Sequence, residues 1–325
     1  MKAIITGVYG QDGSYMAELL SSKGYEVFGV ARKHLSDNSI LIKKNLDVKN
    51  INIKLYDCNL NSFDSVAAML KDIQPDEFYH FSAVHFSAEN KESDDQDRNI
   101  FSANIAYSLN IIDSIKIFSK HTKLVQAGSC LMYDSATISP QSEKLHYDSN
   151  SIYGLSKITA SNLAKIYREN YKLHLSTALL YNHESPRRAM QFVSKKIVSN
   201  VCKIKNNQID FFELGDITAI KDWGYAKDYV YAMWLMTQTA LPDDYIISTG
   251  IEHSVKDMLD IAFEEVGIRD WTKYVRLQQV ISRKTNVLLI GDNTKLKSQL
   301  GWKPSISFKE LIKLMVTNEL NNKVD

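Results

Sequence analysis

The chain has 325 residues, of which 44% are hydrophobic, and its 39 Lys and Arg nearly balance its 38 Asp and Glu to give a formal net charge of +1. This composition allows a large core in two lobes and excludes a general attraction to nucleic acid or to an anionic membrane surface. The three cysteines are too widely spaced for a disulfide framework or a zinc site, and no apolar run reaches the length of a signal peptide or a membrane span. We therefore expect a cytoplasmic protein with no metal site, no nucleic-acid partner and no membrane partner.

Short β-rich runs alternate with helical patterns in the first 130 residues. The predicted strands are 3–6, 26–31, 52–56, 77–81 and 123–127, and the predicted helices between them are 14–23, 63–71 and about 99–118. This alternation is typical of parallel βαβ units. The fold class is therefore α/β, a Rossmann doubly wound parallel sheet with helices on both faces. The polar, acidic segment 85–97 is expected to be a surface loop.

The second part of the chain has a more helical pattern. A long helix is predicted at 152–171 and a strand at 173–181, followed by helices at 255–266, 294–300 and 308–320. No internal repeat or low-complexity tract is visible, which excludes a solenoid and a disordered tail.

A glycine-rich segment follows the first predicted strand and opens the first predicted helix. Glycines at such a turn let the backbone approach a pyrophosphate at the helix N-terminus. The G-x-x-G-x-x-G spacing is typical of short-chain dehydrogenases/reductases, whereas a tight turn without a ligand is the alternative. The position at the start of a βαβ unit favours a dinucleotide cofactor bound by Gly7, Gly10, Gln11, Asp12 and Gly13.

The end of the second strand indicates which dinucleotide is bound. An NAD site has an acidic residue there for the ribose hydroxyls, but this chain has Arg32 and Lys33. Two cations can hold the additional phosphate of NADP(H), and a solvated basic loop is the alternative. Asn59 and Leu60 follow the third strand, where this superfamily places a residue against the adenine.

Tyr153 and Lys157 are four residues apart at the start of the predicted helix 152–171. At this spacing the two side chains share one helix face. A nearby ammonium is expected to lower the pKa of the phenol towards working pH, so that Tyr153 exchanges a proton with a substrate hydroxyl or carbonyl. Ser129 follows the fifth strand and is expected to bind the same oxygen. The alternative is a surface tyrosine with a solvated lysine.

Several segments resemble the GDP-mannose 4,6-dehydratase family. Residues 7–18 resemble its cofactor turn, and residues 181–188 (YNHESPRR) resemble its N-H-E-S-P-R-R signature. The similarity continues through 192–197, 222–230, 248–250, 291–292 and 300–304. It implies an NADP-binding Rossmann domain in residues 1–180 and a smaller, mostly helical sugar-nucleotide lobe in residues 181–325, with some strands and helices of the second part returning to the first.

The resemblance also implies the roles of further residues. His183 and Arg188 would border the cofactor, and the residues facing the nucleotide sugar would be Asn182, Glu184, Lys196, Lys221, Arg283 and Asn286. Lys221 stands where the family has an arginine, and Asn286 where it has a ribose-binding glutamate. Without the resemblance, the charged side chains at 183–184 and 187–188 would be interpreted as surface charges. Relatives pair through helices equivalent to 99–118 and 152–171, which implies a homodimer or homotetramer.

The sequence departs from the family at the catalytic base. The family pattern T-S-E-L-Y-G aligns with Ser129-Cys130-Leu131-Met132-Tyr133-Asp134, so Leu131 occupies the position of the glutamate. Loss of a general base typically costs about 10²- to 10⁴-fold in rate. Cys130 is a poor substitute, because a thiol without a basic neighbour is little ionised and burial would ionise it less. Asp134 is expected to be a loop carboxylate.

These residues favour an NADP(H)-dependent C4 reductase or dehydrogenase that acts on a GDP-linked hexose or heptose. One alternative is a functional GDP-mannose or GDP-heptose 4,6-dehydratase with a displaced base. The second alternative is a non-catalytic subunit that binds the sugar nucleotide or NADP.

Overall fold

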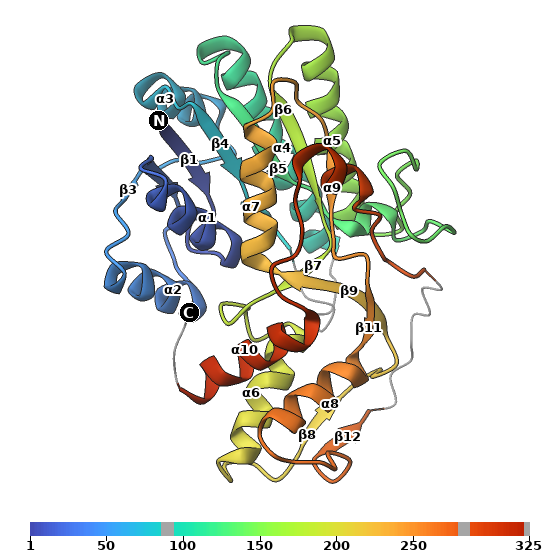
Figure 1. Cartoon of the computed structure of the whole chain (residues 1–325). Helices are drawn as coiled ribbons and strands as arrows, with labels where there is room; N and C mark the ends of the chain where they lie inside the picture. The colour runs from blue at the N-terminus through green and yellow to red at the C-terminus, as the bar shows by residue number, and fades with distance from the viewer. Residues whose placement is uncertain (86–93, 279–286, 322–325) are drawn as a thin grey trace.

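A parallel sheet forms the centre of the molecule (Figure 1). The structure is a computed structural model that describes residues 1–85, 94–278 and 287–321. The sheet has seven strands in the order β10-β6-β5-β4-β1-β2-β3, and every neighbouring pair is parallel. Its strands are β1 (Lys2–Thr6), β2 (Glu26–Val30), β3 (Ile53–Leu55), β4 (Glu77–His80), β5 (Lys123–Ala127), β6 (Leu175–Leu180) and β10 (Tyr245–Ile247).

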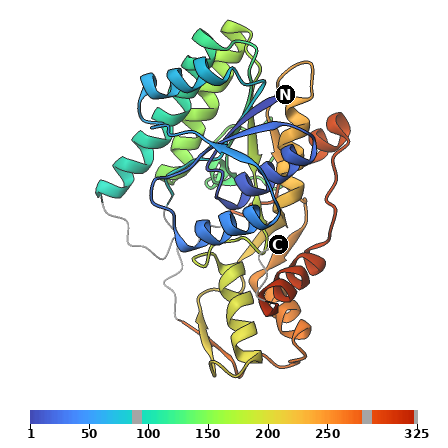
Figure 2. The same ribbon diagram turned by 90° about the vertical axis from the view of Figure 1, so that its left-hand side faces the viewer.

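Helices cover both faces of this sheet, as Figure 2 shows in side view. One layer contains α3 (Phe63–Ile73), α4 (Asp94–Phe118) and α5 (Ile152–Tyr171), and the other contains α1 (Gln11–Ser22), α2 (Asp37–Val48), α7 (Ala226–Thr237) and α9 (Thr294–Leu300). Alternate residues of β1 enter opposite cores: Ile5 packs with the α1 and α7 layer, whereas Ile4 packs with the α3 and α4 layer. Because successive side chains of the strand point to opposite faces, both faces of the sheet are buried under helices, which confirms the doubly wound fold.

A second, smaller core lies at the lower end of the molecule in Figure 1. Helices α6 (Val193–Lys205), α8 (Val255–Glu265) and α10 (Phe308–Leu320) pack around it. Its strands form a sheet of β7 (Asn182–Glu184), β9 (Ile220–Tyr225) and β11 (Glu252–Ser254) and a pair of β8 (Phe212–Leu214) and β12 (Val275–Leu277). Strand β10 and helices α7 and α9 come from the same half of the chain but pack with the large sheet.

The predicted element boundaries differ from the structure at two places near the cofactor turn and the acidic segment. Helix α1 begins at Gln11, three residues before the predicted start, because the glycine turn lets the helix follow directly on the strand. Helix α4 begins at Asp94, inside the segment that was expected to be a loop. Residues 86–93 of that segment lie outside the described residues. In the described part of the chain, no helix combines the length and apolarity needed to cross a membrane.

Candidate functional site

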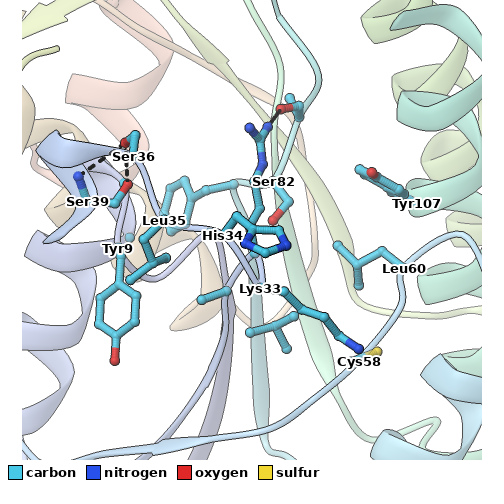
Figure 3. Close-up of a pocket in the computed structure, with 18 of the residues that line it drawn as sticks. Tyr9, Lys33, His34, Leu35, Ser36, Ser39, Cys58, Leu60, Ser82 and Tyr107 are labelled. Atoms are coloured by element: carbon cyan, nitrogen blue, oxygen red, sulfur yellow. Dashed lines mark hydrogen bonds between the residues drawn. The ribbon is translucent and has the colours of Figure 1, made fainter. Parts of the chain in front are cut away.

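A cavity of about 960 Å³ opens at the carboxyl ends of β1, β2, β3 and β4 (Figure 3). Ligands of open α/β sheets bind at this edge. The cavity brings together nine of the thirteen residues that the sequence predicts for the cofactor: Gly7, Gly10, Gln11, Asp12, Gly13, Arg32, Lys33, Asn59 and Leu60. The other four, Tyr153, Lys157, His183 and Arg188, do not line it. The nine lining residues are spread over the first 60 positions of the chain, so the fold has assembled them into one surface.

The glycine turn leaves no room for side chains between β1 and α1. Gly7 has a φ of +72°, a left-handed conformation that favours glycine. A Cβ atom on Gly13 would lie 2.2 Å from the Gly7 carbonyl oxygen. The N-terminus of α1 therefore reaches the cavity directly, with Gly10 as its N-cap residue. Such a terminus favours an anionic group because its first N–H groups and the helix dipole point at it.

The basic side chains lie at the far rim of the cavity. Arg32 donates a hydrogen bond to the Ala83 carbonyl at 3.1 Å, whereas the Lys33 ammonium lies 3.7 Å from the Asp57 carboxylate and both side chains are largely exposed. Sequence reasoning missed other lining residues, among them Tyr9, His34, Ser36 and Ser39. The pattern Ser36-Asp37 was a usable signal, since Ser36 caps α2 and its hydroxyl accepts from the Ser39 N–H.

Ser129, Tyr153 and Lys157 lie beyond the cavity lining, near the end of β5. Ser129 precedes the short helix η1 (Cys130–Tyr133), and its hydroxyl accepts from the Leu131 N–H at 3.2 Å. The Lys157 ammonium donates to the Ala127 carbonyl at 2.9 Å and lies 5.7 Å from the Tyr153 ring centroid. These contacts place the end of β5 against the first turns of α5.

The pKa values of Tyr153 and Lys157 differ from the sequence expectation. Burial raises the pKa of Tyr153, with smaller increases from Cys130 and Asp12 and a decrease from Arg188. Burial also lowers the pKa of Lys157 to about 8. The expected lowering of the tyrosine pKa by Lys157 is therefore wrong, because desolvation of the phenolate dominates and the ammonium is directed to a backbone carbonyl.

The His183 side chain links the small sheet to the cofactor turn. Its Nδ1 lies 2.7 Å from the Tyr181 carbonyl and its Nε2 lies 3.0 Å from the Asp12 carboxylate, so both ring nitrogens face acceptors. The doubly protonated ring satisfies both contacts. Burial alone would lower the pKa of His183, but the Asp12 carboxylate raises that pKa above its ordinary value. Burial alone would raise the pKa of Asp12, but His183 holds that pKa below its usual range. The two side chains form a buried ion pair.

Most of the N-H-E-S-P-R-R segment is also buried, whereas Asn182 and Arg188 are half-buried. Glu184 accepts from Ser194 and lies 3.1 Å from the Arg188 Nε atom. Arg187 has no exposed surface; it donates to Ser14 at 2.9 Å and pairs with Glu18 of α1. The alternative that these residues are surface charges is therefore wrong. Ser14 and Glu18 lie 173 and 169 positions away from Arg187 in the sequence, which explains why the local sequence gave no signal of its burial.

The structure describes only some of the residues that were predicted to bind the nucleotide sugar. Asn182 and Lys221 lie on neighbouring strands of the small sheet, and the Asn182 amide is directed at the Asp222 carbonyl at 3.4 Å. Lys196 lies on α6. Arg283 and Asn286 lie outside the described residues. Among the residues that the structure describes, no cluster of His, Cys, Asp and Glu could hold a metal ion.

The structure places Leu131 and its neighbours Cys130 and Asp134 in different surroundings. Leu131 packs against the large core as part of η1. Cys130 is buried, and burial raises the pKa of its thiol to about 11. Asp134 accepts from the Asn150 N–H at 2.7 Å, as expected of a loop carboxylate.

The doubly wound sheet, its glycine turn and the order Ser129, Tyr153, Lys157 define the class of extended short-chain dehydrogenases/reductases. Residues 4–315 match the model of the family described as GDP-mannose 4,6 dehydratase. GDP-mannose 4,6 dehydratase 1 of Arabidopsis thaliana is 39% identical over 324 residues, which cover 98% of this chain and 89% of the relative. The chain belongs to the GDP-mannose 4,6-dehydratase family.

Two solved structures are similar in fold. One is dTDP-glucose 4,6-dehydratase from Bacillus anthracis in complex with NAD, with a TM-score of 0.83, 18% identity and coverage of 99% of this chain and 97% of the other. The second is RMD from Pseudomonas aeruginosa complexed with NADPH, with a TM-score of 0.79, 16% identity and 99% coverage of both chains. At such identities the likeness describes the fold alone.

Proposed function

We propose that this chain is an NADP(H)-dependent enzyme that transfers hydride at C4 of a GDP-linked hexose or heptose without eliminating water. Family membership supports a nucleotide-sugar substrate, because the relatives are named for GDP-mannose. The observation that carries the proposal is the combination of Ser129, Tyr153 and Lys157 at the end of β5 with Leu131 at the position of the expected base.

The cavity fits a nicotinamide dinucleotide. The glycine turn offers the α1 N-terminus to a pyrophosphate, and Arg32 and Lys33 offer cations where an NAD site would have an acidic residue. RMD, which shares the fold, was solved with NADPH. We assign the cofactor to residues 1–180 and the nucleotide sugar mainly to residues 181–325. The bound dinucleotide would supply or accept the hydride.

Tyr153 handles the proton in this proposal. Burial keeps the side chain as a phenol, which can donate a proton to the oxygen of a C4 ketone. In the reverse direction Tyr153 accepts the proton of the C4 hydroxyl. Ser129 orients that oxygen, and Lys157 places a cation near the phenol. The phenol is the form of Tyr153 with which the reductase direction begins.

Elimination requires a group that removes the proton from C5. Leu131 has no proton to exchange, and the thiol of Cys130 stays protonated because burial raises its pKa to about 11. The carboxylate of Asp134 is directed at a backbone N–H of the following loop. These three side chains support hydride transfer without loss of water.

A functional 4,6-dehydratase is the second candidate. The observation that favours it is the extent of the similarity, which covers 98% of the chain. A non-catalytic subunit is less well supported, since Ser129, Tyr153 and Lys157 are all present.

The test is to incubate the purified chain with GDP-mannose and, separately, with GDP-manno-heptose, each in the presence of NADP⁺. In a second arm, each sugar nucleotide is first oxidised enzymatically at C4 and is then incubated with the chain and NADPH. Products are identified by mass spectrometry while the absorbance of the reduced nicotinamide is followed. We expect stoichiometric formation or consumption of NADPH with no loss of water. Tight binding of the sugar nucleotides without any change in cofactor absorbance would instead support the non-catalytic subunit.

A further inference from the structure

His85 lies beside Tyr153 at the end of the described segment that follows β4. The centroids of the two rings are 4.6 Å apart, and the rings meet edge to face at 83°. From the sequence, His85 was expected to lie in a surface loop without a role in the site. The structure instead brings an imidazole to the side chain that we expect to exchange a proton with the substrate.

The backbone next to His85 is held by the two helices behind it. The Val84 N–H donates to the Asn104 side-chain oxygen at 2.7 Å, and the Asn104 amide donates to the Val84 carbonyl at 3.1 Å. The same amide lies 3.1 Å from the hydroxyl of Ser156, which precedes Lys157 on α5. Asn104 is almost fully buried, so this connection is protected from water. The position of His85 is thereby tied to the helix that carries Tyr153.

Part of the His85 ring is covered and part is open. Phe192 stacks against the imidazole with a centroid distance of 6.4 Å and an angle of 18°. The Arg188 guanidinium lies 3.5 Å from the Phe192 ring centroid and is paired with Glu184. His85 nevertheless remains exposed. The ring is therefore positioned by aromatic contacts while part of the residue stays accessible.

The charges around His85 favour its neutral form. Removal of part of the ring from water lowers its pKa, and the positive charges of Arg188 and Lys157 lower it further. A neutral imidazole has one N–H donor and one nitrogen acceptor. Within the described residues, the His85 side chain makes ring contacts but no hydrogen bond or ion pair. This donor and acceptor match a sugar hydroxyl, which also donates and accepts.

We propose that His85 binds the sugar of the nucleotide sugar directly and helps to select its hydroxyl pattern. The inference rests on the proposed function, in which Tyr153 meets the C4 oxygen. A hexose in that position presents the substituents of its neighbouring carbons to the side chain that touches the Tyr153 ring. His85 is thus a substrate-binding residue, and the alternative is a packing residue that only supports Tyr153.

The experiment compares binding of GDP-mannose with binding of GDP by calorimetry, using the full chain with NADPH present so that GDP-mannose binds without being oxidised. In the His85→Phe variant the ring is kept and the polar atoms are lost. We expect its affinity for GDP-mannose to fall about tenfold, the usual effect of one lost hydrogen bond, while its affinity for GDP stays within about twofold. His85→Asn keeps a donor and an acceptor and should recover part of the affinity.

His121→Phe is the matched control, because His121 is an exposed histidine that precedes β5 at the opposite end of that strand. It should leave both affinities unchanged. Equal affinity of wild type and His85→Phe for GDP-mannose would overturn the assignment and leave His85 as a packing residue. A wild-type chain that binds neither GDP nor GDP-mannose would contradict the proposed function itself, which separates the two failures.

Discussion

Tyr153 and Lys157 lie one helical turn apart on α5, yet burial shifts their pKa values in opposite directions. Both shifts favour the neutral side chain, as desolvation requires. The phenol is therefore ready to donate a proton, and Lys157 keeps its charge below a pH of about 8. The usual picture of a lysine that simply creates a phenolate does not describe this arrangement of side chains.

The first prediction concerns the Tyr153 hydroxyl. Tyr153→Phe should lower the rate of hydride transfer by about 10²- to 10⁴-fold, because the ring remains and only the proton-transfer group is lost. NADPH binding, measured by fluorescence, should be unchanged. Tyr171→Phe, at the exposed end of the same helix, is the control and should keep full activity. Normal turnover by Tyr153→Phe would show that another group transfers the proton.

At the scale of single elements, the start of α1 has two functions. Its glycine turn shapes the cavity, and its Asp12 carboxylate forms the buried pair with His183 of β7. Gln11 strengthens this link: its amide donates to the His183 carbonyl at 3.0 Å and its oxygen accepts from Ser185 at 2.7 Å. The cofactor turn and the N-H-E-S-P-R-R segment are therefore one structural unit.

Gly13→Ala tests the shape of the turn. The added methyl carbon would lie 2.2 Å from the Gly7 carbonyl oxygen, so α1 must move away from β1. We expect at least a tenfold loss of NADPH affinity by fluorescence titration, an order-of-magnitude effect of displacing the pyrophosphate site. Ser22→Ala, at the exposed far end of α1, should bind NADPH normally. Unchanged affinity in Gly13→Ala would place the pyrophosphate elsewhere.

The ion pair between Asp12 and His183 predicts a defined pH window of stability. The pKa of Asp12 is depressed in the folded state, so its contribution to stability is lost as the pH falls through the folded-state pKa. The pKa of His183 is raised, so its contribution to stability is lost as the pH rises through the folded-state pKa. Asp12→Asn should cost about 3 kcal/mol of unfolding free energy, and the cost should be greatest between about pH 4 and 6.5.

The measurement for this pair is urea unfolding at several pH values, with Asp64→Asn as the control. Asp64 is an exposed acidic residue in the first turn of α3. Its substitution should change stability little at any pH. A cost of Asp12→Asn that stays constant from pH 5 to a strongly alkaline pH of about 10 would contradict a charged His183.

Sequence patterns predicted the elements best where the pattern extends over many residues. Six of the seven strands of the large sheet and helix α5 were predicted because their apolar periodicity is regular, whereas the three-residue strand β10 was missed. Helix α2 was missed, since only Ile42 and Leu46 are buried on it and its pattern is weak. Five of the proposed cofactor residues could be predicted together because one local motif, residues 7–13, contains them.

The second half of the site could not be predicted in the same way. The burial of His183 depends on Asp12, and the place of His85 depends on Tyr153 and Phe192, all of which are distant in sequence. Periodicity contains no information on such pairs. The resemblance to the family indicated which residues matter, but only the fold shows their partners.

At the scale of the whole molecule, we propose that α4 and α5 form the interface of a homodimer or of a homotetramer. The two helices pack on one another, and large apolar side chains remain exposed on them, including Ile117, Leu155 and Ile166. Leu155→Glu combined with Ile166→Glu should halve or quarter the mass measured by light scattering, because charges at an apolar interface are costly. Leu241→Glu is the exposed control away from both helices. A monomeric wild type would refute the interface.

The central claim is that this member of the family transfers hydride at C4 but removes no proton from C5. Its most direct test is incubation with GDP-mannose and NADP⁺ in deuterated water, followed by mass spectrometry of the sugar. We expect no deuterium at C5 and no loss of water, whereas Leu131→Glu should restore some of both. A 4-keto-6-deoxy product that contains deuterium at C5, formed by the wild-type chain, would contradict this expectation and establish a dehydratase with a displaced base.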